Sequence, residues 1–394
     1  MESKVNKLRP TMVWLKTIYK KGKLTLAIIL TLIIFLSLLN LAIDIHPAKA
    51  WTGTVFIKPD GSIEPPEAPI ITNDKVTYKL TGNIDSDPDA IVITRSNIIF
   101  DGSGYIITGR GVGIGIKLDN VINVTVKNVN FIDSEGIFLY RAKNCNIIAN
   151  NLTKYGSIYI VSSSNNKISG NNIIGKASAI LLGTSSNNII ENNVIVIMPG
   201  FEKPSGILLS RSSNNIIIKN SIVNYEKAGK GIEIVRSSNN TFYHNNIISE
   251  GKYVYDHSWD NKTVPSSINN WDNGYPTGGN YWSNYSGKDE KKGPNQDIQG
   301  SDGIGDVPYI IDQNNKDRYP LIKPIEFKIP DLTFTVSITT PIVTEPIIGD
   351  GETYIMENNR LKSIFETYLY FLVLLVVIII IVGLVITIKR ILKF

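Results

Sequence analysis

The chain has 394 residues, a formal net charge of +5 and one cysteine, Cys145. Eight basic residues lie within 1–50 and three more follow residue 388, which leaves the middle of the chain net negative. This segregation excludes a basic nucleic-acid-binding patch on the folded part, and a lone cysteine excludes an intramolecular disulfide framework.

The first 50 residues predict a targeting segment. An apolar run over 24–43 follows seven basic residues and precedes the small residues Ala48 and Ala50. A basic start, an apolar centre and a small-residue cleavage site are typical of a secretory signal peptide, so we favour cleavage after Ala50. The apolar run is also long enough for an uncleaved N-terminal anchor, which remains the alternative.

Residues 96–252 contain a repeat whose clearest copies read SSSNN, TSSNN, RSSNN and RSSNN. The copies are 20–27 residues apart, and we interpret one asparagine in each as a rung of a structural ladder. The expected rungs are Asn97, Asn123, Asn146, Asn166, Asn188, Asn215 and Asn240. Residues 51–95 and 253–325 are expected to cap the two ends, because exposed strand edges must be covered.

The repeat predicts an all-β fold, a right-handed parallel β-helix of about seven coils. Each unit holds two or three short runs of Ile and Val, which favour strands, separated by Asn, Ser and Gly, which favour turns. Stacked coils bring equivalent residues together, so Asn side chains can bond to one another along the stack. A leucine-rich repeat has a similar period but requires a Leu frame that the sequence lacks.

Ionisable residues within the repeats are the candidates for catalysis. Sugar-cleaving chemistry commonly needs two carboxylates facing one bond, whereas the acids here are scattered along the sequence. Solvated turn charges are therefore the favoured interpretation. The strongest candidates for a reactive face are Asp133, Glu135, Arg141, Arg211, Glu233 and Arg236. Arg211 and Arg236 occupy equivalent positions, so they are expected to stack and could grip a uronate or sulfate.

The segment 253–325 contains a loop rich in Asp and Gly with Asp297, Asp302 and Asp306. Spaced aspartates with intervening glycines can gather oxygen ligands around calcium. The alternative is a turn in which each Asp bonds nearby backbone. The same segment carries an aromatic cluster that fits either a glycan platform or a plug for the end of the β-helix, the latter being favoured.

The remaining C-terminal features predict surface exposure and membrane attachment. Asn261 and Asn284 lie in glycosylation sequons within expected loops. Residues 326–367 are expected to form a stalk, and an appended small β module is the alternative. The 21 residues from Tyr368 to Ile388 predict a transmembrane helix, and the basic tail 389–394 places its end in the cytoplasm. The bulk of the chain is therefore expected outside the cell.

Three stretches resemble one known family. The chain carries TVFIKPDGSIEPPEAPI, then SNIIFDGSGYIITG before the repeats, and GGNYWSNYSG with SDGIGDVPYIID and DRYPL after them. Residues 54–325 look like the NosD-like right-handed β-helix proteins of archaeal cell surfaces. The resemblance implies the fold and a relation to carbohydrate-binding and sugar-hydrolase β-helices. Copper delivery is not expected, because the candidate donors show no clustered spacing.

Together these patterns favour a membrane-anchored extracellular protein that binds glycans or serves in adhesion or envelope structure. A membrane-anchored polysaccharide lyase or glycoside hydrolase is the alternative, and an accessory factor for a membrane complex is the second alternative. No cofactor other than calcium is suggested.

Overall fold

The computed structural model describes residues 50–326 apart from 87–88, 110–112 and 201–202. The predicted targeting segment, the stalk beyond residue 326, the transmembrane helix and the cytoplasmic tail lie outside these residues. Within the described part, no helix has the length and apolar character needed to cross a membrane.

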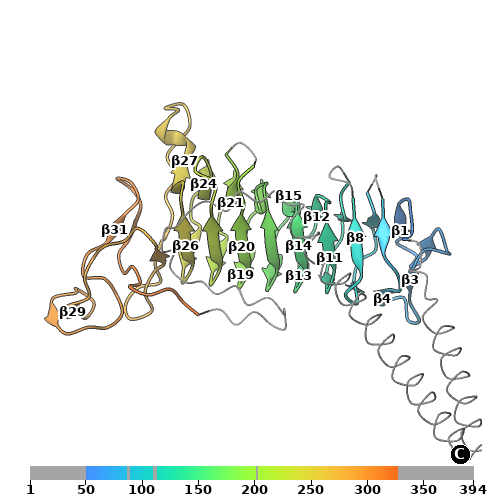
Figure 1. Ribbon diagram of the computed structural model, residues 1–394, viewed down its shortest axis with the longest axis horizontal. Coiled ribbons are helices and arrows are strands. Elements are labelled where there is room, and N and C mark those ends of the chain that lie inside the picture. Colours follow the sequence, from blue (N-terminus) through green and yellow to red (C-terminus); the bar gives the residue numbers. More distant parts are fainter. Residues whose placement is uncertain (1–49, 87–88, 110–112, 201–202, 327–394) are drawn as a thin grey trace, which may run out of the picture. The chain divides into compact units, whose positions relative to one another are not determined.

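The described chain winds through three long sheets in repeated order, which makes it a parallel β-helix (Figure 1). Sheet 1 contains β2 (Ile63–Glu64), β1 (Val55–Ile57), β6 (Ile91–Ile93), β9 (Ile116–Asp119), β12 (Gly136–Tyr140), β15 (Ser157–Val161), β18 (Ile180–Gly183), β21 (Ser205–Ser210), β24 (Lys230–Val235) and β27 (Lys252–Asp256). Sheet 2 contains β3 (Ile70–Ile71), β4 (Thr77–Leu80), β7 (Ile98–Asp101), β10 (Val124–Lys127), β13 (Asn146–Ile148), β16 (Lys167–Ser169), β19 (Ile189–Glu191), β22 (Ile216–Ile218) and β25 (Thr241–Tyr243). Sheet 3 contains β5 (Ile84–Asp85), β8 (Ile106–Thr108), β11 (Asn130–Ile132), β14 (Asn151–Lys154), β17 (Asn172–Gly175), β20 (Val194–Ile197), β23 (Ser221–Asn224), β26 (Asn246–Ser249) and β28 (Tyr281–Trp282).

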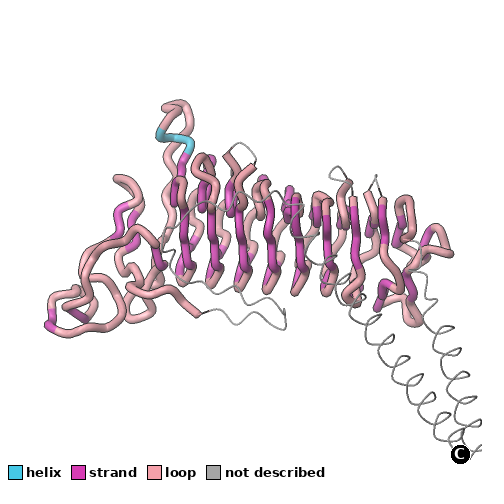
Figure 2. Tube along the Cα trace, viewed as in Figure 1, coloured by secondary structure: helices cyan, strands magenta, loops and turns pink. Residues whose placement is uncertain are grey.

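The remaining elements belong to the C-terminal cap. They are the 3₁₀-helix η1 (His257–Trp259), cyan in Figure 2, and two small antiparallel pairs. The pairs are β29 (Lys291–Lys292) with β30 (Ile298–Gln299), and β31 (Tyr309–Ile310) with β32 (Lys316–Asp317).

Eight three-strand coils run from β4 to β27, close to the predicted seven. The additional coil, made of β4, β5 and β6, falls within the segment expected to be the N-terminal cap. The antiparallel pairings of β2 with β1 and β3 with β4 cover the N-terminal end instead. The fold class predicted from the repeat is confirmed.

The interior is built from stacked aliphatic side chains. Along sheet 1, Ile137 pairs with Ile158, Ile158 with Ile180, and Ile180 with Ile207, and each is fully buried. Strand residues alternate between this interior and the outside because the side-chain period of a strand is two. One coil cannot bury its apolar side alone, so stability comes from the interfaces between neighbouring coils.

Three ladders of buried polar side chains mark the bends. In each ladder, a side-chain oxygen accepts a hydrogen bond from the backbone N–H of the equivalent residue in the preceding coil. The serine ladder contains Ser163, Ser185, Ser212, Ser237 and Ser267. The first asparagine ladder contains Asn166, Asn188, Asn215, Asn240, Asn269 and Asn315. The second contains Asn150, Asn171, Asn193, Asn220, Asn245 and Asn280.

The register of the first asparagine ladder differs from the expected one in the early coils. Ile98, Val124 and Cys145 occupy the buried ladder position there, as the strand pairing requires. Asn97 and Asn123 stand one residue earlier, at the left-handed bend, where the Nδ2 of Asn123 donates to the Oδ1 of Asn97. Asn146 stands one residue later, at the start of β13. Because the register is offset by one residue, these three asparagines are outside the buried ladder.

All three ladders end on carboxyl groups at the C-terminal end of the solenoid. The serine ladder ends on Asp256, which accepts from the N–H of Ser267 at 3.1 Å. The first asparagine ladder ends on Asp312, which accepts three bonds from Asn315, at 2.9, 2.9 and 3.0 Å. The second ends on Asp317, which accepts from the N–H of Asn280 at 2.7 Å. A carboxyl group suits this place because the last rung of each ladder presents N–H donors, and the oxygens of a carboxyl group accept them.

Aromatic rings close the end of the interior. Trp271 stacks on Phe242 and Trp282 stacks on Tyr309, with ring centroids 4.3 Å apart in both pairs. Both tryptophans are 1% exposed. These four rings therefore plug the end of the β-helix, which is the favoured one of the two interpretations of the aromatic cluster.

Candidate functional site

The outer face of sheet 1 carries a continuous column of side chains from successive coils. Strand pairing aligns each member with the next, and we call this set the sheet-1 column. Its members are Phe138, Tyr159, Leu181, Leu208, Glu233 and Tyr255. Neighbouring strands are ~4.8 Å apart, so the five steps span ~24 Å. Five of the six members are partly exposed, whereas Glu233 is only 8% exposed.

Aromatic rings gather at one end of the sheet-1 column. The rings of Phe138 and Tyr140 are stacked at 6.3 Å, and Phe138 lies 6.1 Å from Tyr159. The guanidinium of Arg141 lies 5.0 Å from the centre of the Tyr140 ring. Aromatic faces beside a cation form a surface that is apolar at its centre and charged at its edge.

A charged cluster occupies the other end. Glu233 Oε1 lies 2.6 Å from Nε2 of His257, and Glu233 Oε2 accepts from Nζ of Lys230 at 3.1 Å and from the hydroxyl of Ser205. The backbone of β24 places Lys230 three residues before Glu233, and the pairing of β27 with β24 places His257 beside them. The Nζ of Lys252 lies 4.0 Å from the centre of the Tyr255 ring.

The contacts fix the protonation of two members of this cluster. Burial raises the pKa of Glu233, but the bonds from Ser205 and His257 and the charge of Lys230 outweigh it, and the net pKa is below the ordinary value. The hydrogen bond to Asp260 at 2.5 Å, together with burial, raises the pKa of Tyr255 to about 12. Glu233 is therefore ionised and Tyr255 protonated at neutral pH.

Both oxygens of Glu233 are occupied, so this carboxylate is poorly placed to act as a nucleophile or as a general acid. The side chain of His257 is 40% exposed and is oriented through Nε2 by Glu233. Its other ring nitrogen, Nδ1, is not bonded to Glu233. One oriented histidine beside lysine cations can bind an anion or take part in proton transfer.

The six predicted reactive-face residues lie on different parts of the solenoid. Asp133 forms an ion pair with Lys154 at 2.8 Å in the turn between sheets 3 and 1. Glu135, in the same turn, precedes β12, which is four strands from β24 in sheet 1, or ~19 Å. Arg211 and Arg236 occupy adjacent coils at exposed left-handed bends, with φ of 49° in both. Arg141 lies at the aromatic end and Glu233 belongs to the charged cluster. Burial raises the pKa of Tyr159, and the charge of Glu135 raises it further, so Glu135 also adjoins the sheet-1 column.

Sequence reasoning missed Ser205, Lys230, Tyr255 and His257. The signal for Tyr255 was its position one coil beyond Glu233, on the same face of the same sheet. Ser205 and His257 were harder to assign, because they lie 28 and 24 residues from Glu233 in a repeat of variable length.

Two of the three aspartates of the predicted calcium loop accept hydrogen bonds from backbone amides. Asp302 accepts from the N–H groups of Gly293 and Ile304, and Asp306 from that of Lys291 at 2.9 Å. Asp297 is exposed. Across the residues that the structure describes, no group of three or more His, Cys, Asp or Glu is arranged to hold a metal ion.

The two predicted glycosylation sites are both exposed. Asn261 accepts from the N–H and the hydroxyl of Thr263, the third residue of its own sequon, at 3.0 and 2.7 Å.

Comparison with known proteins identifies a family and several structures with similar folds. The family model "Periplasmic copper-binding protein (NosD)" matches residues 71–287. A search of curated proteins gives no match. The periplasmic alginate epimerase AlgG is 15% identical over 52% of this chain and 71% of its own, with a TM-score of 0.29.

Two further structures are similar. The Dettilon tailspike protein gp208 is 15% identical over 60% of this chain and 58% of its own, with a TM-score of 0.35. The A-module of the mannuronan C-5 epimerase AlgE4 from Azotobacter vinelandii is 13% identical over 59% of this chain and 83% of its own, with a TM-score of 0.31. At this identity these likenesses concern the fold alone.

Proposed function

The chain belongs to the NosD family, and we propose that its β-helix binds polysaccharide along the outer face of sheet 1. In this proposal the apolar segment from Tyr368 to Ile388 tethers the protein to the membrane, with the β-helix outside the cell. The observation that carries the proposal is the sheet-1 column, in which aromatic and aliphatic side chains remain partly exposed over consecutive coils.

The shape and chemistry of this face suit a chain of sugars. Aromatic rings such as Phe138, Tyr140 and Tyr159 offer flat apolar surfaces on which the C–H faces of sugar rings can stack. Arg141 at one end and His257 at the other offer charged or polar partners for hydroxyl and acidic groups. An exposed apolar strip rimmed by polar groups is typical of an interaction surface, and its regular spacing favours a ligand with its own linear repeat.

The experiment is a binding assay of the full chain against a panel of neutral and acidic polysaccharides. Tyr159→Ala is expected to weaken binding about tenfold or more, by analogy with the stacking of a nucleic-acid base on an aromatic side chain, which contributes about 1–3 kcal/mol. Tyr243→Ala is the matched control, because Tyr243 is also a partly exposed tyrosine but lies on sheet 2. Equal binding by wild type and Tyr159→Ala would refute the proposal.

A polysaccharide lyase or glycoside hydrolase is the second candidate, and the cluster around Glu233 is the observation that favours it. His257 is oriented by a carboxylate and exposed to the face on which the ligand is proposed to lie. The release of new chain ends from a bound polysaccharide, by wild type but not by His257→Ala, would replace the binding proposal with the enzymatic one.

Copper binding receives no support from the described side chains, although the family description names it. Copper sites gather His, Met or Cys donors around one point. Cys145 is buried in the interior, Met198 is exposed after β20, His244 follows β25, and His257 follows β27 on sheet 1. These donors stand on different faces and coils, so they do not fit a copper site, and no step of the proposed function involves the metal.

A further inference from the structure

A second polar site lies at the C-terminal end of the solenoid and shares no residue with the sheet-1 column. It is an open pocket of about 530 Å³, and we call it the C-terminal cavity. It lies between residues 269–274, which pair with β25 at the end of sheet 2, and residues 314–318, which include β32 of the cap. The lining residues are Asn269, Asn270, Trp271, Asp272, Asn273, Gly274, Asn314, Lys316 and Arg318.

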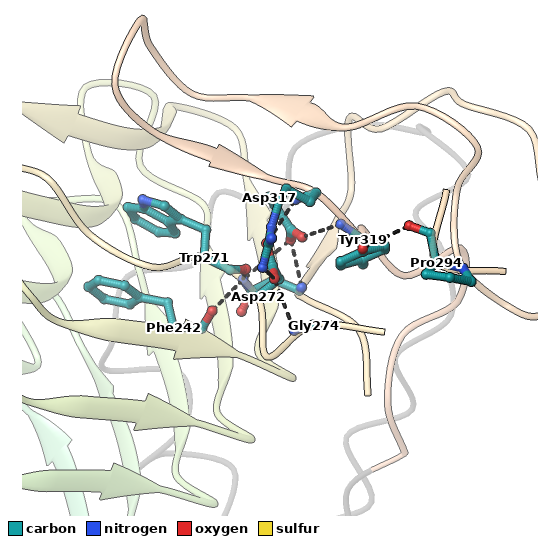
Figure 3. Close-up of polar contacts among 9 residues, drawn as sticks. Phe242, Trp271, Asp272, Gly274, Pro294, Asp317 and Tyr319 are labelled. Carbon is teal, nitrogen blue, oxygen red and sulfur yellow. Dashed lines mark hydrogen bonds and ion pairs between the residues drawn. The ribbon is translucent and has the colours of Figure 1, made fainter. Parts of the chain in front are cut away.

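One arginine in this cavity is fixed in place by a buried acid. Asp272 accepts from the Nε of Arg318 at 3.0 Å, from its Nη2 at 2.6 Å and from its backbone N–H at 3.0 Å. A fourth bond comes from the N–H of Gly274 at 3.0 Å. Figure 3 shows Asp272 beside Asp317, next to the stacked rings of Phe242 and Trp271.

The two partners differ sharply in exposure, and this difference points to a ligand. The side chain of Asp272 is 3% exposed, whereas that of Arg318 is 53% exposed. A guanidinium has five N–H donors, and Asp272 takes two of them from the side chain. The three that remain belong to the exposed part of a group whose orientation is already fixed, so little entropy is lost when they bind a partner.

The other groups around the cavity define what that partner must be. Lys316 is exposed on β32, two residues before Arg318, and adds a second positive charge. Asp272 is the sole acid among the described lining residues, and its charge is already paired with Arg318. Asn270, Asn273 and Asn314 are exposed and contribute amide groups, which donate to and accept from hydroxyls.

We propose that this cavity binds a sugar acid, with the carboxylate of the ligand on the free edge of Arg318 and beside Lys316. The planar edge of a guanidinium matches the two oxygens of a carboxylate. The asparagine amides then form hydrogen bonds with the hydroxyls of the same sugar ring. The site is independent of the sheet-1 face, and it gives the protein a contact for single acidic sugars or chain ends.

The test is calorimetry on the full chain with a disaccharide of 1,4-linked glucuronic acid and with its methyl ester. The ester keeps the shape and loses the charge, so we expect it to bind at least about tenfold more weakly. Lys316→Gln leaves the pair of Asp272 and Arg318 intact and is expected to weaken binding of the acid about threefold to fivefold. Lys292→Gln, the same change on β29 outside the cavity, is the matched control and is expected to have no effect.

Arg318→Lys keeps the charge and removes the planar edge, and is expected to weaken binding about tenfold. The melting temperature of Arg318→Lys is compared with that of wild type to check that the cap is intact. If the melting temperature falls, the binding data for Lys316→Gln are used to test the proposal instead. Equal binding of the acid and the ester, or equal losses in Lys316→Gln and Lys292→Gln, would overturn the proposal. Loss of disaccharide binding in Tyr159→Ala would overturn it too, because it would place the sugar acid on sheet 1.

Discussion

Replacing Asn188 by alanine should be among the most destabilising single changes in the repeats, although the neighbouring Asn187 in the same motif should tolerate the change. The Oδ1 of Asn188 accepts from the backbone N–H and the Nδ2 of Asn166, both at 3.0 Å. Its Nδ2 donates to the Oδ1 of Asn215 at 3.1 Å and to the carbonyl of Ser186 at 3.2 Å.

The size of the effect follows from these contacts. Asn188 is 0% exposed, so water cannot replace the lost partners without entering the interior. Two donors of Asn166 would lose their acceptor, and each buried polar group left unpaired costs about 1–3 kcal/mol. With the lost contact to Asn215, the free energy of unfolding should fall by roughly 3–5 kcal/mol.

Asn187 provides the matched control because it is exposed and has a φ of 60°. Alanine is strained in this left-handed conformation by about 1–2 kcal/mol, so Asn187→Ala should cost no more than that. Glycine adopts the conformation freely, and Asn187→Gly should be close to neutral. Urea unfolding followed by circular dichroism measures all three variants. Similar losses for Asn188→Ala and Asn187→Ala would refute the assignment of the ladder.

Three further predictions concern groups in the interior and the cap. Burial raises the pKa of Asp317 to about 7, so this group stabilises the fold below pH 4 and loses that contribution as pH rises through 7. The free energy of unfolding of wild type should therefore fall between pH 5 and 7 by more than that of Asp317→Asn, and parallel curves would contradict this. Cys145 is fully buried, and burial raises the pKa of its thiol, so a thiol reagent should label it only after unfolding; labelling of the native protein within minutes would disagree. A Cβ on Gly279 would overlap the carboxylate of Asp317, so Gly279→Ala should lower the melting temperature by several degrees. Gly274→Ala is the control, because no atom lies within 4 Å of a Cβ there. This control should cost only the backbone strain of alanine at a φ of 72°.

The fold could be predicted from the sequence because each repeat contains the strand and turn residues that one coil needs. Ile and Val alternate with outward-facing residues in the strands. The two consecutive asparagines of SSNN have two different structural roles. The first Asn, such as Asn187, adopts the left-handed bend, and the second, such as Asn188, enters the ladder. The pattern is unambiguous only where both are present.

The early coils show why the register could not be read fully from the sequence. In the stretch Asn144–Cys145–Asn146, the middle residue is the buried one, and its N–H donates to Asn166. Two asparagines flank it, so composition alone allows either to be the rung. Only the pairing of β13 with β10 and β16 decides between them.

The charged cluster and the C-terminal cavity were less predictable for a related reason. Loops between strands vary in length, so Ser205, Glu233 and His257 meet in space without a fixed spacing in sequence. In the cap the ladders continue through Asn269 and Asn280, but 29 and 35 residues separate them from their partners Asn240 and Asn245. The motif there is altered to SSINN at 266–270, and its spacing from the preceding copy is longer, so the long-range contacts are needed to define the site.

The most direct test of the proposed function is a crystal structure of the chain with an oligosaccharide taken from a polysaccharide that it binds. The proposal predicts sugar rings lying along the outer face of sheet 1, with at least one ring stacked on Phe138, Tyr140 or Tyr159. Ordered sugar only on the outer faces of sheets 2 and 3, with sheet 1 unoccupied, would contradict it.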